Sequence, residues 1–122
     1  PTRCHEYLFL FSKNEKYKYH IDAQKGPNGR RVRDVWSINT KANKETSGHF
    51  AVYPIELIEP CILFGTNEND LILDPFMGSG STAVAANQLN RRFVGIELNP
   101  DYYQMSINRL CAEGMSVLED LA

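Results

Sequence analysis

The sequence has few cysteines, no long hydrophobic run and no pattern typical of a metal site. Cys4, Cys61 and Cys111 are far apart and form no CxxC pair, which predicts free thiols. The three histidines add no metal-ligand spacing. No apolar run is long enough to span a membrane, and the polar start does not have the pattern of a signal peptide. We therefore expect no metal ion, no membrane contact and a cytoplasmic location.

The charges are unevenly divided along the 122 residues, a length that predicts one compact domain. Residues 1–50 contain ten Lys or Arg against five Asp or Glu, whereas residues 51–122 contain three against ten. A basic segment is suited to a polyanion, and an acidic one repels phosphate. This division predicts a basic part over residues 1–48 and a separate ligand-binding part over residues 49–122.

A glycine turn between a predicted strand and a predicted helix is the clearest local feature. Residues 71–73 are an apolar run that predicts a buried strand, and the small residues at 83–89 predict a helix packed closely on a sheet. Gly78 and Gly80 allow the backbone to turn sharply and to approach a ligand. The start of the following helix offers unpaired N–H groups. The stretch therefore predicts a ligand site.

Two carboxylates are expected beside this turn. Residues 92–97 predict the next strand, and Glu97 at its end follows Gly80 by 17 positions. If the two strands are neighbours, Glu97 is placed to accept both hydroxyls of a ribose. Residues 78–83 also fit the glycine pattern of NAD-binding domains. Asp74, however, would repel a pyrophosphate and attract the ammonium and sulfonium of S-adenosylmethionine, so we expect that cofactor, with a dinucleotide as the weaker alternative.

Four stretches form a recognisable set: residues 3–13, 49–58, 74–86 and 93–103. Together they resemble the C-terminal half of the β-class amino-methyltransferases of DNA, which modify N6 of adenine or N4 of cytosine. The resemblance covers nearly the whole chain. It implies an α/β class, with a partial Rossmann-like methyltransferase fold preceded by a small, irregular, basic N-terminal part.

The resemblance also implies roles for individual residues in binding S-adenosylmethionine. Asp74 is expected at the methionine ammonium, Thr82 near the methionine carboxylate, and Glu97 at the ribose. The nine expected cofactor-binding residues are Asp74, Phe76, Gly78, Gly80, Thr82 and Glu97, with His49, Phe50 and Ala51 closing over the methionine end.

A basic loop is the candidate contact with double-stranded DNA. Pro27 and two glycines leave no regular element between residues 24 and 33, and Asn28-Gly29 predicts a tight turn. Four cations in this loop are suited to backbone phosphates, although an ordinary solvated loop is an equally good interpretation. The expected DNA-binding residues are Lys25, Arg30, Arg31 and Arg33.

The family's catalytic tetrad does not occur in the sequence. That tetrad is an Asp, Asn or Ser followed by Pro-Pro and an aromatic residue, and Asp74-Pro75-Phe76 lacks the second proline. We therefore expect no catalytic residue here and no turnover by the chain alone. An open strand edge predicts pairing with a companion chain that carries the tetrad, or a homodimer. The alternative is a non-catalytic, truncated remnant that persists as a folded module and binds cofactor, DNA or neither.

The remaining patterns predict strands and helices around this centre. Residues 6–11, rich in aromatics, predict a covered strand, and residues 16–20 predict a second strand. Pro54 is expected at the first position of a helix that bends near Pro60 and ends at Gly65. A last helix is expected after Asn99, with a buried stripe of Tyr103, Ile107, Leu110 and Cys111.

Overall fold

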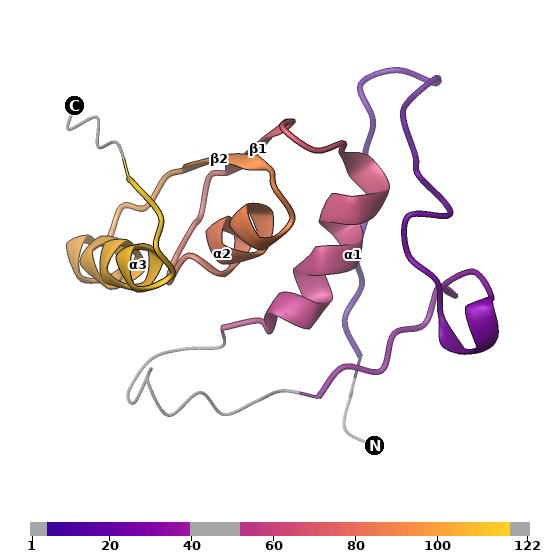
Figure 1. Ribbon diagram of the computed structural model, residues 1–122, viewed down its shortest axis with the longest axis horizontal. Helices are drawn as coiled ribbons and strands as arrows, with labels where there is room; N and C mark the ends of the chain where they lie inside the picture. Colours follow the sequence, from indigo (N-terminus) through magenta and orange to yellow (C-terminus); the bar gives the residue numbers. More distant parts are fainter. Residues whose placement is uncertain (1–4, 40–51, 118–122) are drawn as a thin grey trace.

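The computed structural model describes residues 5–39 and 52–117. Within them the chain forms one 3-10 turn, three α-helices and two strands (Figure 1). In chain order these are η1 (Pro27–Gly29), α1 (Ile55–Gly65), β1 (Leu71–Asp74), α2 (Ser81–Gln88), β2 (Arg92–Gly95) and α3 (Pro100–Ala112). The predicted α/β class is confirmed.

The two strands form a parallel sheet joined by the α2 crossover. Leu71 pairs with Arg92, and Asp74 pairs with Gly95 at the carboxyl end. The prediction that these strands are neighbours is therefore confirmed. Figure 1 shows all three α-helices on the same side of the sheet, with α2 between α1 and α3.

The core lies around α2, whose small side chains permit close packing on both neighbours. Residues 83–86 are almost completely buried. Ile62 of α1 packs against Ala85 and Ala86, and Leu110 of α3 packs against Ala83 and Val84. The expected close packing of this helix is confirmed. The core thereby fixes the start of α2 relative to the ends of both strands.

The prediction of a buried strand at residues 71–73 is wrong for one of its two faces. Ile72 packs against the core, whereas Leu71 and Leu73 are exposed. Side chains alternate between the faces of a strand, and in the described part of the chain the helices cover only one face. An apolar run of this length does not reveal whether both faces are covered.

The predicted strands at residues 6–11 and 16–20 do not form, because no neighbouring strand pairs with them among the described residues. Tyr7, Phe9 and Phe11 are exposed rather than covered, and their rings follow one another at centroid distances of 6.1 and 6.4 Å. The end of the second segment, residues 19 and 20, instead contacts the last turn of α1. The His20 N–H donates to the Phe64 carbonyl at 2.8 Å, and the Tyr19 ring lies 5.5 Å from that of Phe64.

The helix ends agree with the predictions except in detail. Pro54 is the N-cap of α1 rather than its first helical residue, and the helix continues through Pro60. Asn99 caps α3 as predicted, since its side chain accepts from the backbone N–H of Asp101 at 2.9 Å. Cys111, predicted to be buried, is exposed, and Ser106 occupies a fully buried position of the helix instead.

Candidate cofactor site

The glycine turn lies at the carboxyl ends of both strands. It begins at Asp74, the last residue of β1, and leads through Gly78 and Gly80 to α2. The Met77 N–H donates to the Ile96 carbonyl, and the Ile96 N–H donates to the Asp74 carbonyl, each at 2.9 Å. These bonds hold the turn against the chain that leaves β2. This edge of a parallel sheet is where ligands of open α/β folds bind.

Asp74 is held in place by three neighbouring groups. Its Oδ1 accepts from the backbone N–H of Phe76 at 3.0 Å. Its Oδ2 accepts from the Thr82 hydroxyl at 2.6 Å and lies 3.4 Å from the Tyr53 hydroxyl. A carboxylate has about four lone-pair positions. Asp74 is therefore oriented and still has capacity to accept from a cationic ligand.

Tyr53 and Thr82 form a chain of hydroxyls that ends on Asp74. Their oxygens lie 2.5 Å apart. Because the single hydroxyl hydrogen of Thr82 is directed to Asp74, the hydrogen between the two hydroxyls comes from Tyr53. Sequence reasoning did not include Tyr53 in the site. Its position next to Pro54, inside the matching stretch 49–58, was the available signal.

Glu97 connects the glycine turn to the start of α3. Its Oε2 accepts from the Gly78 N–H at 2.7 Å, and its Oε1 accepts from the Asn99 N–H at 2.8 Å. Each oxygen retains a further lone pair on which a ligand hydroxyl can donate. The sequence-based placement of Glu97 beside the turn is therefore correct in position, whatever it binds.

The two glycines of the turn adopt a backbone that other residues rarely adopt. The φ angles of Gly78 and Gly80 are +54° and +81°, so the predicted sharp turn is confirmed. Gly80 is also the N-cap of α2 and provides no side chain to its first N–H groups. Those groups are left for water or for a bound ligand.

Arg109 of α3 forms hydrogen bonds to the same turn. Its guanidinium donates to the Ser79 carbonyl at 3.3 Å and to the Ser81 hydroxyl at 3.2 Å. The two serines flank Gly80, so one side chain contacts both sides of the N-cap. Nothing in the sequence pattern indicated this contact, which depends on how α3 packs.

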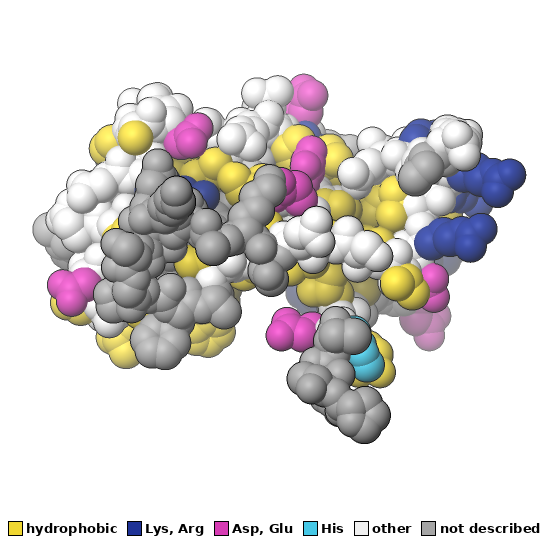
Figure 2. All heavy atoms as spheres, turned by 90° about the horizontal axis from the view of Figure 1, so that it is seen from below, with side chains coloured by type: hydrophobic (Ala, Val, Ile, Leu, Met, Phe, Trp, Pro, Cys, Tyr) yellow, Lys and Arg dark blue, Asp and Glu magenta, His cyan; other side chains and the backbone are white. Residues whose placement is uncertain are grey.

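The other predicted site residues are not all brought together. Phe76 is 87% exposed on the outside of the turn. His49, Phe50 and Ala51 lie outside the described residues. The four cations of the basic loop belong to a different region, at the end of the molecule where Figure 2 shows dark-blue side chains gathered.

The basic loop is closed by its own backbone and partly neutralised by one acid. Lys25 and Arg31 form an antiparallel bridge, and Asn28 and Gly29 both have positive φ. Asp22 forms ion pairs with Lys25 and with Arg31, the latter at 3.7 Å. The hydrogen bond and charge of Lys25 lower the pKa of the Asp22 carboxyl. Within the described residues the guanidinium groups of Arg30 and Arg33 have no ion-pair partner.

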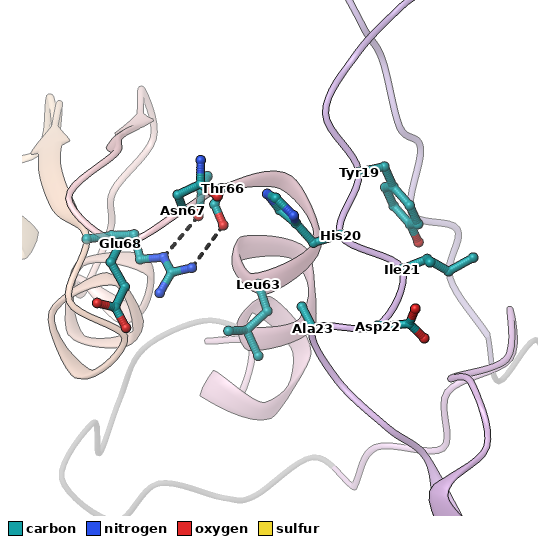
Figure 3. A pocket seen from close by; sticks show the side chains of 10 residues that line it. Tyr19, His20, Ile21, Asp22, Ala23, Leu63, Thr66, Asn67 and Glu68 are labelled. Atoms are coloured by element: carbon teal, nitrogen blue, oxygen red, sulfur yellow. Dashed lines mark hydrogen bonds between the residues drawn. The ribbon is translucent and has the colours of Figure 1, made fainter.

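A hollow of about 520 Å³ lies elsewhere, beside the end of α1 (Figure 3). Its walls come from residues 19–23 and from Leu63, Thr66, Asn67, Glu68 and Arg91. The Arg91 guanidinium donates there to the Thr66 hydroxyl at 3.1 Å and to the Thr66 backbone carbonyl at 2.9 Å. None of the predicted cofactor residues that the structure describes lines this hollow. The carboxylates and glycine turn, rather than the hollow, therefore define the candidate site.

Tyr53 gives the site a measurable pH dependence. Burial raises the pKa of its hydroxyl above the ordinary 10.0, and the Asp74 charge adds to that effect. Because folding favours the protonated form, its contribution to stability is present below about pH 10 and is lost as the pH rises through the raised pKa. As the pH is raised from about 9 to about 11, we expect the free energy of unfolding to fall less in Tyr53→Phe than in the wild type. Urea unfolding at each pH measures this free energy. The exposed Tyr17→Phe is the control, and an identical loss in all three proteins would contradict the expectation.

Two other kinds of feature are absent from residues 5–39 and 52–117. No group of three or more His, Cys, Asp or Glu is arranged to hold a metal ion there. No helix in that part of the chain is long and apolar enough to cross a membrane.

Comparison with known proteins identifies the family. Residues 1–108 match the model of the N6/N4 DNA methylases. The chain is 48% identical to the type II methyltransferase M.Cfr9I of Citrobacter freundii and 43% identical to M.XycI of Xanthomonas campestris pv. cyanopsidis. Each alignment covers 97% of this chain and 40% of the relative, so the chain spans about two fifths of the length of these relatives.

Solved structures agree with the sequence comparison. The cytosine-N4-specific PvuII DNA methyltransferase superposes with a TM-score of 0.71 at 25% identity, over 86% of this chain and 40% of the other. The complex of M1.HpyAVI with S-adenosylmethionine gives 0.57 at 34% identity, over 86% of this chain and 44% of the other. The fold, the site geometry and these matches lead to one conclusion. The chain belongs to the family of N6- and N4-directed DNA methylases.

Proposed function

We propose that this chain is the S-adenosylmethionine-binding part of a DNA methyltransferase that methylates an exocyclic amine, N6 of adenine or N4 of cytosine. The observation that carries the proposal is the pair of anchored carboxylates, Asp74 and Glu97, on either side of the glycine turn. The match to the complex of M1.HpyAVI with S-adenosylmethionine supports it.

The chemistry of the site fits this cofactor. Asp74 receives the methionine ammonium, and Glu97 receives the ribose hydroxyls on the lone pairs that Gly78 and Asn99 leave available. The turn at Gly80 admits the ligand close to the backbone, and the exposed Phe76 ring is available to pack beside it. A dinucleotide fits less well, because its pyrophosphate would face the Asp74 carboxylate.

The reaction transfers the sulfonium methyl to the amine of a flipped-out base. The amine nitrogen forms a bond to the methyl carbon as the carbon–sulfur bond breaks, and the nitrogen then loses a proton. This chain's residues hold the donor. The tetrad that would hold the base does not occur in these 122 residues. We therefore propose that turnover requires polypeptide that carries the tetrad, and that these 122 residues alone have none.

Calorimetric titration with S-adenosylmethionine tests the proposal. We expect saturable binding at one site, and no heat from NAD⁺ at the same concentrations. Preferential binding of NAD⁺ would overturn the choice of cofactor. No binding of either ligand by a chain that circular dichroism reports as folded would favour a remnant without a working site.

We propose that the basic loop contacts DNA phosphates through Arg30 and Arg33, whose guanidinium groups have no ion-pair partner among the described residues. We expect Arg30→Gln/Arg33→Gln to weaken binding to a DNA duplex and to reduce the slope of log K against log salt by about 1.8, since each phosphate contact contributes about 0.9. Fluorescence anisotropy across a salt series measures both quantities. Lys13→Gln/Lys16→Gln removes the same charge from another part of the basic segment. An equal effect of both double variants would indicate net charge rather than a local contact.

A further inference from the structure

Tyr53 brings a hydroxyl from the segment before α1 to the carboxyl end of the sheet. The residue is 38% exposed overall, but its oxygen lies 2.5 Å from the hydroxyl of Thr82, which is only 6% exposed. Thr82 in turn donates to Oδ2 of Asp74 at 2.6 Å. The Tyr53 oxygen itself lies 3.4 Å from the same Oδ2. Two hydroxyls from distant parts of the chain therefore converge on one carboxylate oxygen.

The chain on either side of Tyr53 holds this hydroxyl in place. Tyr53 precedes Pro54, and the residue before a proline favours an extended backbone. Ile55, two positions further on, packs against both groups of buried residues in α2, which together span residues 83–86. Thr82 directly precedes those residues in the same helix. The packing that joins α1 to α2 therefore also sets the distance between the Tyr53 and Thr82 hydroxyls.

The directions of the hydrogens decide what each group can do. The hydroxyl hydrogen of Thr82 is directed to Asp74, so Tyr53 supplies the hydrogen between the two hydroxyls. A hydroxyl that accepts a hydrogen bond is polarised and itself donates more strongly. The other carboxylate oxygen, Oδ1, accepts separately from the Phe76 N–H at 3.0 Å. Both oxygens of Asp74 are thus held, and lone pairs remain for a cationic ligand.

We infer that Tyr53 is a positioning residue of the cofactor site, which acts through Thr82 to orient the Asp74 carboxylate for the methionine ammonium of S-adenosylmethionine. This role rests on the proposed function, because that function assigns Asp74 to the ammonium. The single hydroxyl hydrogen of Tyr53 is used on Thr82, so none remains for the ligand itself. A phenylalanine at this position would keep the ring and its packing and would remove only the hydrogen bond.

Calorimetric titration of Tyr53→Phe with two ligands tests this role. S-adenosylmethionine carries the ammonium, whereas 5′-methylthioadenosine keeps the adenosine and the sulfur but lacks the amino-acid end. We expect the affinity for S-adenosylmethionine to fall about 3- to 10-fold, the usual effect of one neutral hydrogen bond, and the affinity for 5′-methylthioadenosine to change by less than about twofold. Tyr17→Phe removes an exposed hydroxyl from the N-terminal segment and should change neither affinity.

The same substitution in an Asp74→Asn background shows whether Tyr53 acts through Asp74. There, Tyr53→Phe should change the affinity for S-adenosylmethionine by less than about twofold, because the effects of residues in one hydrogen-bond network are not additive. An equal loss in both backgrounds would overturn the inference, since Tyr53 would then act independently of the carboxylate. An equal loss for both ligands would overturn it too, since it would indicate a general loosening of the site.

The two kinds of failure can be told apart. If the wild type and Tyr53→Phe bind S-adenosylmethionine equally well, only the role of Tyr53 is contradicted. If the wild type binds neither ligand, the proposed function is contradicted, and the role of Tyr53 with it. Circular dichroism and urea unfolding at neutral pH check that each variant is folded before its affinity is compared.

Discussion

Asp74→Asn is expected to weaken binding of S-adenosylmethionine by about 10- to 100-fold, since a hydrogen bond to a charged group contributes about 1.5–3 kcal/mol. The substitution removes the negative charge that attracts the ammonium and retains the shape of the side chain. The amide oxygen still accepts from the Phe76 N–H, and the amide nitrogen faces the hydroxyls of Thr82 and Tyr53. Because a hydroxyl either donates or accepts, these neighbours adapt, and the fold should lose only about 1 kcal/mol.

Calorimetric titration of the variant measures the affinity, and urea unfolding measures the stability. Asp34→Asn is the control, because it removes one exposed carboxylate from the N-terminal segment, far along the chain from the turn. Unchanged affinity in Asp74→Asn would mean that the carboxylate anchors the turn without touching the ligand. A loss of affinity in both variants would point to the net charge of the protein rather than to the site.

The part of the chain that forms the candidate site was largely predictable because its signals are local. The apolar run at 71–73, the glycines at 78 and 80 and the small residues that follow specify a strand, a turn and a helix within about twenty positions. Glu97 could be placed on the condition that the two strands are neighbours, which a crossover of this length permits and which the parallel pairing of β1 with β2 confirms. Asn99 and Pro100 likewise define the start of α3 from adjacent residues alone.

The N-terminal part was not predictable in the same way, because a strand requires a neighbour. The aromatic composition of residues 6–11 favours a strand, and their i, i+2 ring contacts keep an extended arrangement, but no pairing segment is present among the described residues. Composition reports what a segment prefers when it is paired. It does not report whether the chain supplies the partner.

Side-chain contacts between distant segments were also beyond the sequence. Tyr53 reaches Thr82 across 29 positions, and Arg109 reaches Ser79 across 30. Both contacts depend on the angles at which α1 and α3 pack on α2, and no local pattern encodes those angles. The sequence therefore indicated Asp74, Thr82 and Glu97, whereas Tyr53 and Arg109 were missed.

Gly80→Ala is expected to destabilise the fold by about 2–3 kcal/mol and to weaken donor binding. At a φ of +81° a Cβ atom is strained, which costs roughly 1–2 kcal/mol. The new Cβ would also lie 3.3 Å from the Cβ of Ser106, a fully buried residue on α3. Relief of this contact would shift the start of α2, and with it the N–H groups proposed to face the ligand.

Gly114→Ala separates the two causes of this loss. Gly114 has a similar φ of +75°, but a Cβ there meets nothing within 4 Å. The control should therefore lose only the free energy of backbone strain, about 1–2 kcal/mol, and should bind S-adenosylmethionine as the wild type does. Urea unfolding and calorimetric titration of both variants supply the comparison. Equal destabilisation would show that the packing of α3 under the turn is not what requires a glycine, and unchanged donor affinity in Gly80→Ala would separate the start of α2 from the binding site.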